Sequence, residues 1–231
     1  MKTEISEKAI IFDSSTIINF TMNGLLEEFR ELKKMFNGKF LITQEVKAEI
    51  VDKPSEIKKF RLEALKIQEL ITEKVLEFPS VFGINESKLS SETKKLMNLA
   101  NDTFFGRDNA IHIIDSGETA CLVLSTLLSE KGIKNVISVD ERTIRMISEK
   151  PENLLEILKK KLHSGISAKN ENFKFFKGFK FIRSAELIFL AYKKGVVKLK
   201  NHNVLDALLY AMKFNGCSIS DEEIMQMERL G

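Results

Sequence analysis

The chain has 231 residues, 43% of them hydrophobic, which is the composition of an ordinary soluble globular protein able to bury most of its core. Every apolar run is shorter than the roughly 20 residues that a membrane-spanning helix needs, and residues 1–8 lack the apolar stretch of a secretory signal. The two cysteines, Cys121 and Cys217, form no CxxC pair, which excludes a thiolate metal centre and favours a reducing, cytoplasmic location. We therefore expect no membrane partner.

The net charge is only +3, but the basic residues are unevenly distributed. Residues 158–200 contain twelve lysines and arginines against two glutamates, with five phenylalanines interleaved between 173 and 181. This mixture suits contact with the phosphates and bases of a nucleic acid, and Lys177 and Lys180 are candidate contacts. A solvated helix followed by a strand with inward-facing rings explains the same pattern. We expect residues 167–177 to form a mobile loop.

Strands and helices alternate along the chain. Short apolar runs predict strands at 10–13, 39–42, 110–114, 135–139 and 179–182, and an extended segment at 75–78. Amphipathic spacing and capping residues predict helices over 16–35 and 44–51, a long helix after Pro54 with apolar residues from 57 to 71, and further helices at 87–101, 115–128, 142–148, 154–162, 185–194, 204–214 and 218–230.

This order of elements predicts an α/β fold with three layers, α/β/α, and a mainly parallel central sheet with extra helices. Neither an internal repeat nor a low-complexity linker interrupts the chain. We therefore expect residues 1–231 to form a single domain, with a helical elaboration around 54–109 and a basic segment around 158–177.

Four acidic residues occupy positions suited to chemistry. Asp13 and Asp140 each end a predicted buried strand, Glu49 lies near the start of the helix after the second strand, and Glu118 follows Gly117 in the first turn of its helix. The carboxyl ends of parallel strands meet at one edge of a sheet, where open α/β folds place their ligand sites. Converging carboxylates repel one another unless a cation neutralises them, and hard oxygen ligands select Mg²⁺ or Mn²⁺. Such ions suit phosphodiester hydrolysis.

Each acid also has a simpler explanation. Asp13 and Asp140 could cap the helices that follow them, and Glu118 could complement the dipole of its helix. Glu49 competes with Glu45, which lies one turn earlier on the same helical face, and either could be a solvated surface acid. The combination of the four, rather than any one of them, favours a metal site.

Four motifs in order carry a resemblance to a known family: Ile-Ile-Phe-Asp13-Ser-Ser15, Thr43-x-x-Val46-x-x-Glu49, Asp115-Ser-Gly-Glu118 and Val-Asp140-Glu141-Arg142-x-x-Arg145. The chain resembles PIN-domain ribonucleases, and most of all the group similar to toxins of toxin–antitoxin pairs. Segments at 184–197, 203–208 and 216–220 continue the likeness, so it spans most of the chain.

The resemblance implies a PIN-like fold and a metal-dependent endoribonuclease that binds one or two Mg²⁺ or Mn²⁺ ions. It implies these residue roles: Asp13, Glu49, Glu118 and Asp140 as catalytic metal ligands, Ser15 and Glu141 as site support, and Arg142 and Arg145 as contacts to RNA phosphates. RNA is the implied substrate, and an antitoxin protein and a second copy of the chain are candidate partners.

Alternatives stay open at this point. The chain is longer than compact toxins of this type, so an RNA-processing nuclease competes with a toxin. A catalytically inactive PIN-like module would bind RNA or a protein without cutting. A phosphatase or phosphotransferase with Asp13 as nucleophile would want a second Asp two residues on, where this chain has Ser15. We expect His112 to be packed in the predicted strand 110–114.

Overall fold

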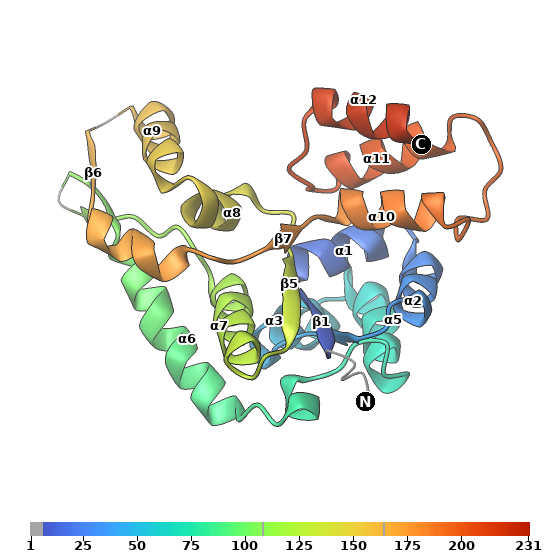
Figure 1. The fold of residues 1–231 in the computed structure, drawn as a ribbon, viewed down its shortest axis with the longest axis horizontal. Coiled ribbons are helices and arrows are strands. Elements are labelled where there is room, and N and C mark those ends of the chain that lie inside the picture. The colour runs from blue at the N-terminus through green and yellow to red at the C-terminus, as the bar shows by residue number, and fades with distance from the viewer. Residues whose placement is uncertain (1–6, 108, 164) are drawn as a thin grey trace, which may run out of the picture.

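The central sheet of the computed structural model, which describes residues 7–107, 109–163 and 165–231, has four strands. All are parallel, in the order β2-β1-β5-β7. The strands are β1 (Lys8–Phe12), β2 (Lys39–Leu41), β5 (Lys134–Ser138) and β7 (Phe181–Ile182). They confirm the predicted strands at 10–13, 39–42, 135–139 and 179–182. Helices lie on both sides of this sheet (Figure 1), which gives the expected three-layer α/β/α fold.

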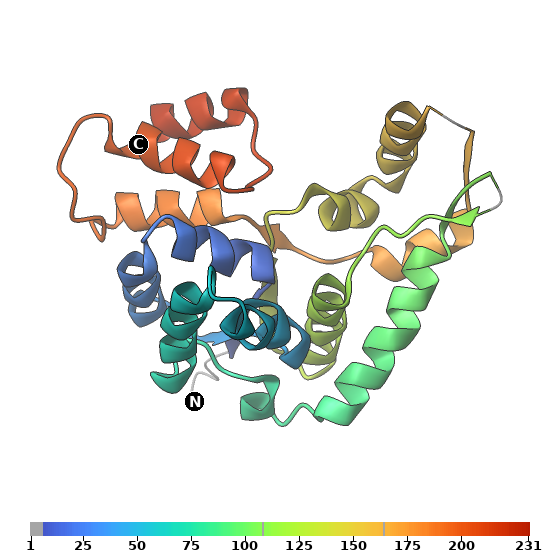
Figure 2. The same ribbon diagram turned by 180° about the vertical axis from the view of Figure 1, so that it is seen from behind.

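The helices follow the predicted order, and those predicted from residue 87 onward are all present. Their bounds are α1 (Ser14–Met22), α2 (Leu26–Met35), α3 (Gln44–Lys47), α4 (Lys53–Glu56), α5 (Arg61–Thr72), α6 (Glu86–Asn101), α7 (Ser116–Glu130), α8 (Arg142–Glu149), α9 (Pro151–Leu162), α10 (Ser184–Lys193), α11 (Val204–Phe214) and α12 (Asp221–Leu230). A π-helical turn, Ala48–Asp52, joins α3 to α4, and 3-10 turns occupy Pro79–Phe82 and Asn170–Phe176. The long helix α6 packs along α7 on the outside of the molecule (Figure 2).

Two of the predicted helices are each divided in the structure. The helix expected over 16–35 is broken after Met22, where Gly24 takes a φ of +70°, a left-handed conformation that glycine adopts without strain. The helix expected after Pro54 breaks at Ile57, whose extended backbone separates α4 from α5. Because Ile57 is exposed rather than packed in the core, the apolar spacing that counted it as a core position is wrong.

The strand predicted at 110–114 is also wrong. The strand is limited to Asn109–Ala110 (β4), followed by one backbone hydrogen bond from Ile111 N–H to the carbonyl of Phe104 at 2.8 Å. It belongs to a second, antiparallel sheet in the order β4-β3-β6, with β3 (Phe104–Gly106) and β6 (Ile166–Ala168). The backbone N–H groups of Ile113 and Ile114 donate instead to the side chain of Asn101, at 2.8 and 3.2 Å. A side-chain amide thus replaces the strand partner that the apolar run suggested.

One further segment is more ordered than the sequence suggests, and another agrees with its prediction. Residues 167–177, expected to be a loop, contain most of β6 and the 3-10 turn, with Phe173 and Phe176 buried. The predicted extended segment 75–78 lies beside β2, where Glu77 forms a parallel bridge with Leu41.

Aromatic rings fill the core between β1, β2 and the helices α1 and α2. The ring of Phe29 lies 5.0 Å from that of Phe12 and 5.3 Å from those of Phe20 and Phe40 (centroid distances), in edge-to-face arrangements. All four rings are essentially inaccessible to solvent. Such pairs contribute beyond the area that they bury, so this cluster anchors α1 and α2 to the sheet.

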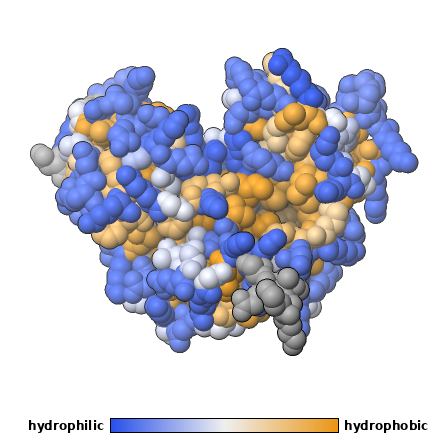
Figure 3. Space-filling view, viewed as in Figure 1, coloured by the Kyte–Doolittle hydropathy of each residue, from blue (hydrophilic) through white to orange (hydrophobic). Residues whose placement is uncertain are grey.

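The outer surface is mostly hydrophilic, with a band of apolar residues across the middle of the face in Figure 3, below a hollow between two lobes. Within the described residues, no helix has the length and apolar character that crossing a membrane requires. The hollow separates α8 and α9 from α11 and α12 (Figures 1 and 3).

We expect Phe29→Ala to lower the free energy of unfolding by about 3–5 kcal/mol, because it removes a ring that is 1% exposed and contacts three others. Urea denaturation measures the change. Phe175→Ala, at a 47% exposed ring, is the matched control and should change stability by no more than about 0.5 kcal/mol. Equal losses in the two variants would contradict this account of the core.

Candidate functional site

A pocket of about 250 Å³ opens at the carboxyl end of β1 and is called the acid pocket here. Residues from the end of β1, the π-helical turn, the segment before α7 and the start of α8 line it. Five of its lining residues are acids: Asp13, Glu49, Asp115, Glu118 and Glu141. Three of the four acids predicted from the sequence therefore meet in one pocket.

Asp13 is buried and only partly satisfied. It follows the last residue of β1 and caps α1, with Oδ2 accepting hydrogen bonds from the backbone N–H (3.0 Å) and hydroxyl (2.6 Å) of Ser15. Its Oδ1 is also buried but has no hydrogen-bond donor among the described residues. A buried acceptor without a donor is costly, so this oxygen is available for a ligand.

Burial and mutual repulsion destabilise the ionised carboxylates of the acid pocket. Burial, followed by the charge of Asp13, raises the pKa of Glu118 to about 8. Burial also raises the pKa of Asp13 to about 6, with a smaller contribution from Glu49, although the hydrogen bonds from Ser15 act in the other direction. Both carboxylates therefore carry a free-energy penalty when ionised, which a cation would relieve.

Glu49 reaches the acid pocket through two local features. It lies in the π-helical turn Ala48–Asp52, a rare geometry that is frequent at functional sites. Its carboxylate lies over Gly117 in the first turn of α7, where an added Cβ would be 2.8 Å from both of its oxygens. Glu45, the competing residue, lines a different pocket beside Glu86. Of these two residues, the structure brings Glu49 to Asp13 and Glu118.

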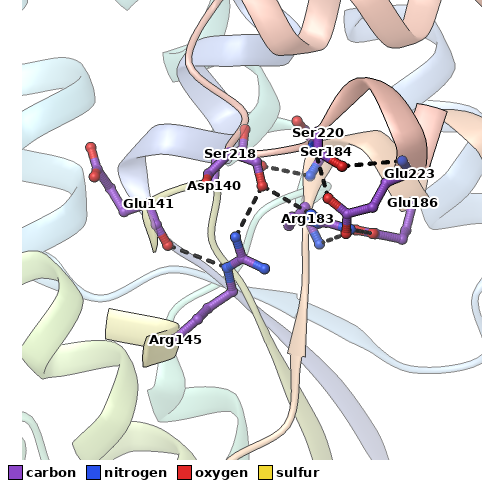
Figure 4. A network of polar contacts seen from close by, with 9 residues as sticks. All are labelled: Asp140, Glu141, Arg145, Arg183, Ser184, Glu186, Ser218, Ser220 and Glu223. Carbon is purple, nitrogen blue, oxygen red and sulfur yellow. Dashed lines mark hydrogen bonds and ion pairs between the residues drawn. The ribbon is translucent and has the colours of Figure 1, made fainter. Parts of the chain in front are cut away.

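Asp140 is placed differently from the prediction. Both of its carboxylate oxygens accept hydrogen bonds. Oδ1 accepts from the backbone N–H of Ser184 at 2.7 Å (Figure 4), and Oδ2 accepts from the side-chain amide of Asn19 at 2.9 Å. Asp140 is 1% exposed and does not line the acid pocket. Its side chain joins the end of β5 to α10 and α1, whereas the next residue, Glu141, lines the pocket.

His112 and Asp115 form a pair at the rim of the acid pocket, with Nε2 of His112 2.7 Å from Oδ1 of Asp115. The expectation that His112 is packed in a strand is wrong, because its side chain is 63% exposed. The described residues that line the pocket include no lysine or arginine. Among them, His112 is the one side chain that can carry a positive charge.

The four predicted RNA contacts lie outside the acid pocket. Arg142 and Arg145, on α8, line a neighbouring pocket on the other side of that helix. Lys177 and Lys180 are exposed just before β7 and line neither pocket. Arg142 and Arg145 are thus adjacent to the acid pocket, because Thr143 on the same helix lines it.

The donor set fits a hard cation. Its potential ligands are all carboxylate oxygens, one of them the buried Oδ1 of Asp13 without a donor. In the ranges that the structure describes, no three His, Cys, Asp or Glu side chains are grouped as they would be around a bound ion. Holding a metal would therefore require these side chains to move closer together.

The sequence missed three contributions to this pocket: Asp115, His112 and the direct participation of Glu141. The first two precede α7, and the signal available for them was their closeness to Glu118 in the chain. Comparison of the chain with family models, with curated proteins and with solved structures gives no match. The acid pocket is therefore interpreted from its own geometry and charge.

The raised pKa values make stability depend on pH. The native state holds the proton of Glu118 up to about pH 8, whereas the unfolded chain releases it near its ordinary pKa of 4.5, so ionisation destabilises the fold increasingly across this window. We expect Glu118→Gln to raise Tm relative to wild type in EDTA, with a larger gain at about pH 8.5 than at about pH 5. Thermal unfolding at the two pH values measures this. A gain that does not vary with pH would contradict it.

Asp140 and Glu141 offer a direct comparison of a structural and a pocket carboxylate. Asp140→Asn should cost about 1.5–3 kcal/mol of stability, because an amide cannot accept from both Ser184 and Asn19 without turning its own donor toward one of them. Glu141→Gln, at an exposed neighbour, should stay within about 0.5 kcal/mol of wild type. Urea denaturation of both variants is the measurement, and the reverse order of effects would refute the assignment.

Proposed function

We propose that the protein is a metal-dependent endoribonuclease of the PIN-domain type that hydrolyses RNA phosphodiester bonds at the acid pocket. The observation that carries this proposal is the buried Asp13, with one carboxylate oxygen lacking a donor, beside Glu49 and Glu118 in one pocket. The parallel sheet and the order of the sequence motifs support it, since both agree with the resemblance to PIN-domain ribonucleases.

Asp13, Glu49, Glu118 and Glu141 are the residues that would hold Mg²⁺ or Mn²⁺. The raised pKa values of Asp13 and Glu118 support this, because a divalent cation would let both groups ionise at neutral pH. When bound, the ion would lower the pKa of water and stabilise the charge that develops on the phosphoryl group. Asp140, predicted as a fourth ligand, acts in this proposal by holding α1 and α10 in place.

The chain's own residues orient the reacting groups. Ser15 fixes one oxygen of Asp13 with two hydrogen bonds and leaves the other free of donors. His112, held by Asp115 through Nε2, offers an imidazole at the rim whose other nitrogen can donate to a phosphate oxygen when the ring is protonated. Arg142, Arg145, Lys177 and Lys180 stay predicted contacts to flanking phosphates, so RNA binding should weaken as salt rises.

Two biological settings suit this chemistry. A toxin would have an antitoxin protein as its partner, and a processing nuclease would act on cellular RNA alone or as a homodimer. A cytoplasmic location suits both. A second candidate function is a PIN-like module that binds RNA without cutting it, and it is favoured by the absence of a preformed metal group among the described residues.

A cleavage assay separates the two candidates. Wild-type protein should cut labelled RNA in Mn²⁺ or Mg²⁺ and lose this activity in EDTA, whereas Asp13→Asn should lower the rate at least about a hundredfold. The variant should fold, because it removes a buried charge and keeps an acceptor for Ser15.

Glu141→Gln and Asp140→Asn extend the assay. Glu141→Gln should lower cleavage at least about tenfold at unchanged stability, because Glu141 lines the pocket. Asp140→Asn should act through stability, with most of its activity recovered at low temperature. Undiminished cleavage by Asp13→Asn, or no metal-dependent cleavage by wild type on any RNA, would overturn the nuclease.

A further inference from the structure

A second pocket, of about 710 Å³, lies on the other side of α8 in the hollow between the lobes (Figure 3) and is called the basic pocket here. Residues of α8, the segment before α12 and the ends of α11 and β7 line it. Five of them are cationic: Arg142, Arg145, Lys150, Arg183 and Lys213. Glu149 and Glu223 also line the pocket, and Arg183 and Lys213 have ion-pair partners. Among the described residues, its cations without an ion pair are Arg142, Arg145 and Lys150, which attract anions.

Arg145 is the half-buried cation of this pocket that lacks a carboxylate partner among the described residues. Its guanidinium is half-buried and donates only to backbone carbonyls, those of Ser218 (3.1 Å) and Glu141 (3.4 Å) (Figure 4). Arg183, beside it, has two carboxylate partners, Glu186 and Glu223. Within the described residues Arg145 has no ion pair, and burial and the charge of Arg183 lower its pKa. A guanidinium with unused donors suits an oxyanion such as phosphate.

The acid pocket and the basic pocket share one helical turn. Glu141 and Thr143 line the acid pocket, whereas Arg142 and Arg145 line the basic pocket. Consecutive Cα atoms are only about 3.8 Å apart, so the two pockets are adjacent across the start of α8. A single nucleic-acid strand can therefore have phosphates in both.

An aromatic pair on α11 lies within three residues of Lys213, which lines the basic pocket. Tyr210 and Phe214 on α11 are stacked, with ring centroids 5.9 Å apart and an interplanar angle of 28°. Phe214 is 80% exposed. Lys213, which lines the basic pocket, is 5.7 Å from the Tyr210 ring and paired with Asp221 at 2.6 Å. The exposed ring of Phe214, next in the chain to a cation of the basic pocket, is a surface on which an unpaired base can stack.

We propose that the basic pocket and the Tyr210–Phe214 pair bind an unpaired RNA strand, with a phosphate on Arg145 and a base on Phe214, while a neighbouring phosphodiester of the same strand lies in the acid pocket. The proposal rests on the ribonuclease function proposed above. It selects single-stranded RNA because the bases of a duplex are already stacked and cannot cover Phe214.

Binding measured without cleavage tests this inference separately from the nuclease. In the Asp13→Asn background, fluorescence anisotropy gives the Kd of a labelled single-stranded RNA, and of a duplex of the same sequence, at several salt concentrations. Arg145→Ala should weaken binding of both RNAs about tenfold and reduce the salt dependence by about one phosphate contact. Phe214→Ala should weaken binding of the single strand about tenfold and that of the duplex by less than twofold.

Matched controls lie on another part of the molecule. Lys66→Ala removes an exposed cation on α5, and Leu62→Ala removes an exposed apolar side chain on the same helix. Both should leave the Kd for either RNA unchanged. Arg145→Lys, which keeps the charge, guards against a folding defect in Arg145→Ala and should weaken binding by an intermediate amount.

Unchanged single-strand affinity in both Arg145→Ala and Phe214→Ala would overturn the proposal and leave this face to a protein partner. If the wild type cuts RNA but these two variants bind normally, the nuclease stands and this inference fails. If the wild type cuts nothing while both variants bind the single strand poorly, the RNA surface stands and the nuclease fails.

Discussion

Hydrogen bonds around Ser15 hold together the two strand ends on which the candidate site depends. The Ser15 hydroxyl donates to Oδ2 of Asp13, just after β1, and accepts from the backbone N–H of Asp140, just after β5. Asp140 in turn accepts from Ser184 at the start of α10. This chain of contacts ties two neighbouring parallel strands to α10, and it leaves Oδ1 of Asp13 without a hydrogen-bond donor among the described residues.

The two aspartates at these strand ends have opposite energetics. Asp140 is buried with both oxygens accepting hydrogen bonds, and these bonds stabilise the native arrangement. Asp13 is buried with one oxygen unpaired and with Glu49 and Glu118 nearby, so its charge destabilises the native state until something positive compensates it. Stability and the proposed activity thus depend on different carboxylates at the same edge of the sheet, and the destabilising ones form the candidate site.

Helix α8 organises the charge around this edge. Its first residues separate a pocket with five acids from a pocket with five cations, and adjacent positions in the chain alternate between the two. A nucleic acid whose cleaved phosphate binds a metal ion among carboxylates needs positive charges close by to neutralise its other phosphates. In the proposed function, one turn of helix would meet both requirements, with Arg145 held in position by the backbone carbonyls of Glu141 and Ser218.

Local patterns in the sequence were sufficient for much of this protein. Apolar runs and capping residues determine the parallel strands, most helices and the position of Asp13 at a strand end, because burial and helix capping act over a few neighbouring residues. They failed at 110–114, where Asn101 replaces a strand partner, and at Ile57, where an exposed residue fits the helical spacing. Asp140 and Glu141 both follow β5, so no local rule distinguishes them. Only the tertiary structure decides, because Asn19 and Ser184, far away in the chain, take both oxygens of Asp140 and leave Glu141 to the pocket.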